Sequence, residues 1–205
     1  MITNYATLKA AVADWLNRAD LTDQIPTFIQ LAEAGLNRDM RTRSMVVRAD
    51  ATIDSQYTTL PLDYLEMTTL YLRTSPVTKL QFLTQEEMQL KKSQGYPTSG
   101  TPRYFSVVGT SMEVLPAPDS AQTAEMIYYG KTPTLSDSNT TNWLLTAHPD
   151  IYLWSSLISS APYLRDDGRI ETWRGLLGAA MDSLVLANSR QEFSGGVVKV
   201  RSRSY

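Results

Sequence analysis

The chain has 205 residues, 42% of them hydrophobic and 20% charged, and its formal net charge is −2; these values predict a globular protein of one domain, or of one domain with a sizeable insertion. Because there are no cysteines, disulfides, thiolate metal sites and cysteine nucleophiles are excluded. The mild acidity argues against nucleic-acid binding driven by overall charge, and no stretch approaches the roughly 18 apolar residues that a membrane span requires.

The first predicted element is an N-terminal helix. Apolar side chains recur at helical spacing over residues 5–16. Thr3 or Asn4 is available as its N-cap, since both can accept a hydrogen bond from a backbone N–H of the first turn.

A second helix follows after a short link. Thr22 or Asp23 is expected to cap it, and Pro26 lies in its first turn, where no backbone donor is lost. Two helices joined by a short loop predict an N-terminal helical hairpin over residues 1–44.

Residues 45–131 are predicted to be a mainly β region. The runs 45–53 and 56–60 are rich in alternating apolar residues and only two residues separate them, so we expect them to pair as a β-hairpin. Further strand-like runs follow, most of them separated by prolines and glycines: MTTLYLR, VTKLQFL, RYFSVV, SMEVL and EMIYYG. One short helix is expected within the region, because Thr84–Glu87 forms a capping box; it would end near Lys92.

Helices return in the C-terminal part, residues 132–194. A polar link leads to one helix from Pro149 to about Tyr163 and another from about Arg169 to Gln191. The last helix has a continuous apolar stripe, formed by Ile170, Trp173, Leu176, Leu177, Ala180, Met181, Leu184 and Ala187. The fold class predicted from this order is α+β: the N-terminal and C-terminal helical hairpins form one bundle, with the mainly β region inserted between them.

No catalytic, cofactor-binding or metal-binding residue is predicted. His148, the only histidine, precedes Pro149 at the expected start of a helix, so we assign it to a helix terminus rather than to a catalytic base. One histidine with scattered carboxylates has no metal-ligand spacing. Gly130–Thr132 looks like the end of a phosphate loop, but Glu125 stands where the first glycine would be.

Residues 142–164 are unusually rich in aromatic side chains, which predicts a packing surface. One stripe of the helix is enough for the bundle core, and Trp143 and Tyr152 add apolar surface beyond it. Two interpretations stand: a fully internal helix, or a helix shared between subunits. On the second interpretation, Trp143 and Tyr152 bind a partner.

Residues 195–205 are predicted to be a C-terminal arm that orders on a partner. A glycine pair releases the chain from the last helix, and valines then favour an extended strand. Lys199, Arg201 and Arg203 would meet an acidic surface on that partner, and Tyr205 would anchor the end; a disordered terminus is the alternative.

A basic cluster lies at the junction of the second helix and the β region. Arg38, Arg41, Arg43 and Arg48 stand near acidic residues in the sequence, and we expect them mostly in salt bridges within or between subunits. A collar of arginines that faces DNA is the alternative.

The chain resembles the head-to-tail adaptor (connector) proteins of tailed bacteriophages. The resemblance is carried by residues 5–41, 57–67, 142–164 and 169–196, which are packing patterns rather than catalytic signatures. It implies a helical bundle with a β insertion, assembled into a homo-oligomeric ring, commonly dodecameric, in the neck of the virion between head and tail. The implied partners are the portal protein and a tail or nozzle protein.

The resemblance also implies that DNA passes through the ring without specific binding, that no membrane is involved, and that assembly takes place in the host cytoplasm. No catalytic residue comes with it. Two alternatives remain: a soluble hydrolase or nucleic-acid-processing protein with a dispersed site, and another virion component such as a tail-completion protein.

Overall fold

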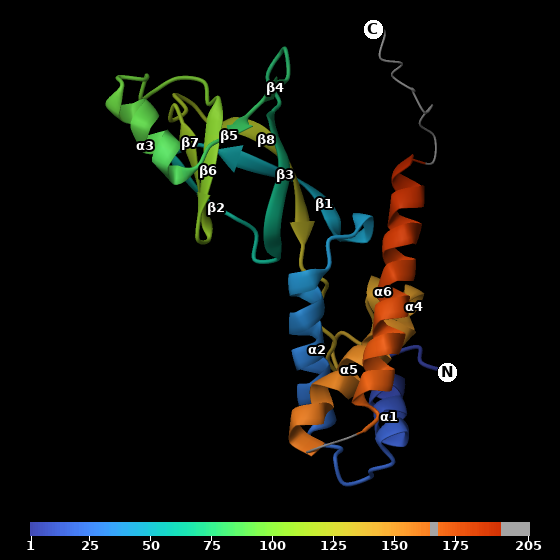
Figure 1. Ribbon diagram of the computed structural model, residues 1–205. Helices are drawn as coiled ribbons and strands as arrows, with labels where there is room; N and C mark the ends of the chain where they lie inside the picture. Colours follow the sequence, from blue (N-terminus) through green and yellow to red (C-terminus); the bar gives the residue numbers. More distant parts are fainter. Residues whose placement is uncertain (165–167, 194–205) are drawn as a thin grey trace, which may run out of the picture. The chain divides into compact units, whose positions relative to one another are not determined.

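A computed structural model describes residues 1–164 and 168–193 of the chain, and it has an α+β fold (Figure 1). The described residues form six α-helices and two four-stranded sheets. By its internal contacts the chain divides into two compact units. The helical unit joins Met1–Ser44 to the chain from Thr132 onward, and the β unit is Met45–Lys131.

The first helix, α1 (Tyr5–Leu16), begins at a capping box. The Asn4 side chain accepts a hydrogen bond from the Thr7 backbone N–H at 2.9 Å, and the Thr7 hydroxyl accepts one from the Asn4 N–H at 2.9 Å. Two N–H groups that a helix start leaves without partners are thereby satisfied, so Asn4 is the cap. The apolar stripe buries Leu8 and Val12 completely.

In the second helix, α2 (Ile25–Asp39), Pro26 lies in the first turn as predicted. The prediction that Thr22 or Asp23 caps this helix is wrong. The N-cap is Gln24, whose side chain makes no capping bond. The reason is the preceding turn, in which the Leu21 carbonyl accepts hydrogen bonds from the Gln24 and Ile25 N–H groups. That turn runs directly into the helix and leaves no extended cap residue.

Three further helices complete the described part of the helical unit: α4 (Trp143–Ala147), α5 (Pro149–Leu164) and α6 (Ile170–Phe193). The five-residue helix α4 was not predicted; the Asn142 side chain caps it by accepting a hydrogen bond from the Leu145 N–H at 2.9 Å. Helix α5 contacts α1, α2, α4 and α6.

The β unit holds both sheets. In the first sheet the strand order is β1 (Val46–Ile53), β8 (Gln122–Gly130), β3 (Tyr64–Leu72) and β4 (Thr78–Lys79). In the second it is β2 (Tyr57–Thr59), β7 (Ser111–Leu115), β6 (Tyr104–Val108) and β5 (Gln81–Phe82). One core unites residues of both sheets: Ile53, Leu60, Leu70, Leu72, Leu80, Phe105, Met112, Val114, Ala124, Met126 and Tyr128.

The expected hairpin between β1 and β2 is wrong. Strand β1 pairs antiparallel with β8 along its whole length, and β2 pairs with β7 in the other sheet. The link between them carries the chain from one sheet to the other: already at Gln56 the backbone carbonyl accepts a hydrogen bond from Val114. Asp54 and Ser55 also lack the glycine that tight two-residue hairpin turns favour. The run VTKLQFL likewise divides at the buried Leu80 into β4 and β5, one in each sheet.

The short helix α3 (Gln85–Ser93) begins at Thr84, as its capping box predicts. The Thr84 N–H donates to Glu87 Oε2 at 2.8 Å, and the Thr84 hydroxyl accepts from the Glu87 N–H at 3.3 Å. Lys92 of this helix forms an ion pair with the buried Glu113 of β7, which ties α3 to the second sheet.

Candidate subunit interface

A buried polar cluster positions the aromatic-rich helix α5. The Tyr152 hydroxyl donates to Glu33 Oε1 of α2 at 3.0 Å and accepts from Asn142 Nδ2 at 2.6 Å. The Leu135 backbone N–H donates to the same Glu33 oxygen at 2.8 Å. Three distant segments therefore meet at one carboxyl group.

The electrostatics of this cluster follow from its burial. Burial raises the pKa of the Glu33 carboxyl above its ordinary value, while the hydrogen bonds from Leu135 and Tyr152 act in the opposite direction. Burial and the neighbouring Glu33 charge raise the pKa of the Tyr152 hydroxyl as well. The hydroxyl therefore keeps its proton and serves as the donor to the carboxyl group.

The structure places the predicted partner-binding residues of this helix pair in different environments. Tyr152 is only 1% exposed and its hydroxyl is already paired, so a partner reaches its ring only if the cluster opens. Trp143, at the start of α4, is half-buried. Ser156 and Ser160 are buried too, and their hydroxyls donate to backbone carbonyls of α5 itself at 2.7 Å. Helix α5 is thus largely internal to its unit.

Helix α6 is different, because the described residues of its own chain cover only part of its apolar surface. Trp173 and Leu184 of the predicted stripe are buried. The other members of the stripe are half-buried or exposed: Ile170, Leu176, Leu177, Ala180, Met181 and Ala187. At the start of the helix, the Arg169 guanidinium donates to the Trp15 carbonyl at 2.9 Å, which links α6 to α1.

A second stripe runs beside the first one on α6. It consists of Leu176, which also borders the first stripe, and of Ala179, Ser183 and Leu186; all four are exposed, and we call them the outer face of α6. The spacing i, i+3, i+7, i+10 keeps these residues on one side of a helix and is the spacing of paired helices. Two leucines flank two small residues, so another helix could approach closely there. Leu186 is 57% exposed.

A single apolar stripe is enough to pack a helix on one core, so the outer face does not follow from the predicted stripe. Ala179, Ser183 and Leu186 lie off the predicted stripe, and only a search for a second period on the same helix would have found them. An exposed apolar face of this kind is typical of interaction sites. It makes the outer face of α6 the candidate interface.

Two members of the basic cluster, Arg41 and Arg48, form local interactions. Arg48 Nε lies 3.2 Å from Glu125 Oε1 in an ion pair across β1 and β8. The Arg41 guanidinium instead donates to the carbonyls of Asn37 and Met40 at the C-terminal end of α2, at 3.0 and 2.7 Å, where a cation is favoured by the helix dipole.

His148 lies between α4 and α5, and its backbone N–H donates to the Leu144 carbonyl at 2.7 Å. Lys199, Arg201, Arg203 and Tyr205 lie outside the described residues. Over residues 1–164 and 168–193, no group of three or more His, Asp or Glu side chains could hold a metal ion. No helix in that part of the chain is long and apolar enough to cross a membrane.

A family model described as SU10 adaptor protein matches residues 3–201. The match runs through both units and covers almost the whole chain. Comparison with curated proteins gave no match.

Proposed function

Because the chain belongs to the SU10 adaptor protein family, a family of phage head-to-tail adaptors, we propose that it forms a ring in the virion neck between the portal and a tail or nozzle protein. It is a structural phage protein and a virion component that interacts with other head or tail proteins. The observation that carries the proposal is the family match over residues 3–201. In the proposal the ring is dodecameric, is assembled in the host cytoplasm, and surrounds the DNA channel.

The outer face of α6 supports ring formation. A helix that exposes leucines at the spacing of paired helices lowers its free energy when a second apolar surface covers them, by about 25 cal/mol for each Å² of apolar surface buried. In the proposal each subunit covers the outer face of its neighbour. Such contacts between different surfaces of identical subunits close into a ring when the rotation from one subunit to the next adds up to a full turn.

The two helical segments of the helical unit, residues 1–44 and 132–194, act in this proposal as one bundle into which the β unit is inserted. Helix α5 lies between the N-terminal helices and α6 and contacts all of them. A bundle of this kind presents α6 to a neighbouring subunit while α5 stays inside.

Partner binding is assigned to Trp143 and to the C-terminal arm, residues 195–205, with the portal or a neighbouring adaptor as the partner. Tyr152 contributes from the interior: its hydroxyl holds Asn142, and Asn142 caps the helix that starts at Trp143. The local interactions of Arg41 and Arg48 support a channel through which DNA passes without specific binding.

The test compares two adjacent and similarly exposed residues of α6. Leu186 belongs to the outer face, whereas Val185, 61% exposed, lies about 140° round the helix from its centre at roughly 100° per residue. We expect Leu186→Asp to abolish rings and Val185→Asp to preserve them, as seen by electron microscopy with and without portal.

Two results would count against these assignments. Rings that survive Leu186→Asp, or that are lost equally in both variants, would remove the outer face from the interface. A natural chain that forms no ring either alone or on the portal would contradict the proposed function itself.

A further inference from the structure

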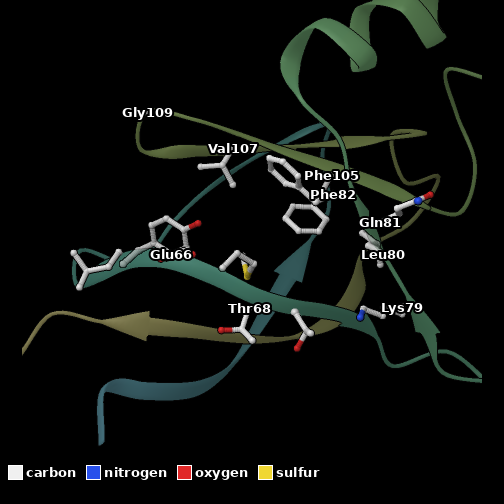
Figure 2. A pocket seen from close by; sticks show the side chains of 13 residues that line it. Glu66, Thr68, Lys79, Leu80, Gln81, Phe82, Phe105, Val107 and Gly109 are labelled. Atoms are coloured by element: carbon white, nitrogen blue, oxygen red, sulfur yellow. The ribbon is translucent and has the colours of Figure 1, made fainter. Parts of the chain in front are cut away.

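An open slot lies within the β unit, beside strands of both sheets (Figure 2). Its volume is about 890 Å³. Strand β3 supplies Glu66 and Met67, β5 supplies Phe82, and β6 supplies Phe105 and Val107. The slot is separate from α6 and from the buried cluster around Glu33, and no role assigned so far uses it.

The slot exists because the segment from β4 to β5 covers each sheet edge only in part. Strand β4 pairs with β3 only at Tyr71 and Leu72, and β5 pairs with β6 only at Tyr104 and Phe105. Beyond these pairs, no described strand covers the edge of β3 over Tyr64–Thr69. On the β5 side of β6, no described strand covers the edge beyond Phe105 either.

One peptide group at this edge is suitably oriented for a main-chain hydrogen bond. The Phe105 carbonyl accepts from the Leu83 N–H on the β5 side. Because peptide groups alternate along a strand, those of Val107 point to the same side as those of Phe105. Val107 lies beyond the paired residues of β5, so its peptide groups face the slot.

The surface of the slot is apolar along one side and charged at its ends. Phe82 is 56% exposed and lies edge-on to Phe105, with 5.5 Å between the ring centres. Figure 2 shows these two rings with Val107 on one side of the gap and Glu66 on the other. Lys79 lies toward the end covered by β4, away from Glu66. An extended segment with an apolar edge and a basic edge would complement this surface.

We propose that the slot receives the C-terminal segment, residues 194–205, of a neighbouring copy of this chain. This proposal rests on the ring proposed above. It gives the C-terminal arm of each subunit a binding site on the neighbouring subunit. Val198 and Val200 would pack on Phe82 and Phe105. In an extended chain alternate side chains point to opposite sides, so Lys199 and Arg201 would project away from the rings, toward Glu66.

The length of the segment fits the slot. At roughly 3.3 Å per residue, the uncovered edge of β3 is about 20 Å long, which six or seven extended residues would span. The segment follows the last helix at Phe193 and begins with Ser194 and two glycines, which leaves Val197–Arg203 for the slot. A segment this short cannot hold a strand by itself, so it needs an existing edge.

The test uses the full chain and the absence of natural cysteines. One preparation carries Val107→Cys and a second carries Val198→Cys; the two are mixed under mild oxidation. We expect a disulfide-linked product of two chains that contains one copy of each variant, resolved by gel and mass spectrometry. A synthetic peptide of residues 194–205 without cysteine should suppress the product by competition.

Two further substitutions, added to the Val107→Cys chain, make the test specific. Phe82→Ser should lower the cross-link yield about tenfold, the effect of losing one apolar contact side chain. Leu62→Ser is the matched control: Leu62 is 97% exposed in the same unit but does not line the slot, so the yield should not change. Both side chains are exposed, so both variants should fold.

Two outcomes overturn the proposal: no mixed product, or equal loss of product with Phe82→Ser and Leu62→Ser. If rings assemble on the portal without cross-linking, the slot assignment fails and the adaptor function stands. If no ring forms from the natural chain, the adaptor function fails whatever the cross-linking shows.

Discussion

Replacing Tyr152 by Phe removes one oxygen from the buried polar cluster around Glu33 in the helical unit. The ring remains, so no cavity forms, and the loss is confined to two hydrogen bonds. Glu33 keeps its bond from Leu135, and Asn142 Nδ2 keeps its bond to the Pro133 carbonyl at 2.7 Å. The change therefore costs one hydrogen bond to a carboxyl group and leaves one amide N–H of Asn142 without its acceptor.

From these two losses we expect Tyr152→Phe to lower the free energy of unfolding by about 2–3 kcal/mol. All four tryptophans lie in the helical unit, so their fluorescence during urea unfolding reports this unit selectively. Tyr163→Phe is the control on the same helix; Tyr163 is 55% exposed, and its change should stay within about 0.5 kcal/mol.

A double-mutant cycle with Glu33→Gln tests the reasoning further. Because Tyr152 and Glu33 share a hydrogen bond, the effects of the two substitutions should not add, and the coupling should be about 0.5–3 kcal/mol. The reasoning is refuted if Tyr152→Phe is no more destabilising than Tyr163→Phe, or if the two effects add.

Further predictions concern other parts of the chain. Since the pKa of Glu33 is raised in the folded state, its contribution to stability is fully present below the unfolded pKa and is lost as the pH rises through the folded value; the unfolding free energy of the natural chain should therefore fall across that range, and Glu33→Gln should flatten the profile. Thr84→Ala should destabilise the β unit by about 1 kcal/mol in thermal unfolding followed by circular dichroism, because it removes the cap of α3; an unchanged midpoint would contradict the capping role. His148→Ala should leave particle infectivity unchanged, and normal particles without infectivity would overturn its assignment to a helix terminus. Deleting residues 197–205 should leave a folded, soluble chain that fails to join portal-bearing heads, unless the arm has no part in assembly.

Local signals in the sequence predicted local structure well. The capping box at Thr84 was predicted because its two partners lie three positions apart in the sequence. At the first helix the sequence offered Thr3 or Asn4 as the cap, and the structure shows that Asn4 is the cap. Pro26 likewise fixed a helix start through its own geometry. By contrast, α4 was missed because five residues carry too little periodicity, although Asn142 was available as its cap.

Pairing over long sequence distances was not predictable in the same way. Residues 45–53 and 56–60 have the pattern of two strands and lie side by side in the sequence, but their partners are β8 and β7, more than fifty residues further on. The choice depends on the shared core, where Ile53 from one sheet and Leu60 from the link after β2 meet the same apolar residues. Residues from the whole β unit contribute to this core. The sequence of two neighbouring runs therefore does not determine which strands they pair with.

The contrast between α5 and α6 shows what an apolar pattern means in a chain that assembles. Helix α5 carries apolar and small residues around most of its circumference, and neighbouring helices of its own unit cover it. Helix α6 carries two stripes that share Leu176; the described residues bury Trp173 and Leu184 of the first stripe and leave the second one exposed. Exposed leucines at regular spacing give no stability to an isolated subunit, because their free energy falls only on burial. We therefore infer that the second stripe of α6 would stabilise the proposed ring and not the fold of the single chain.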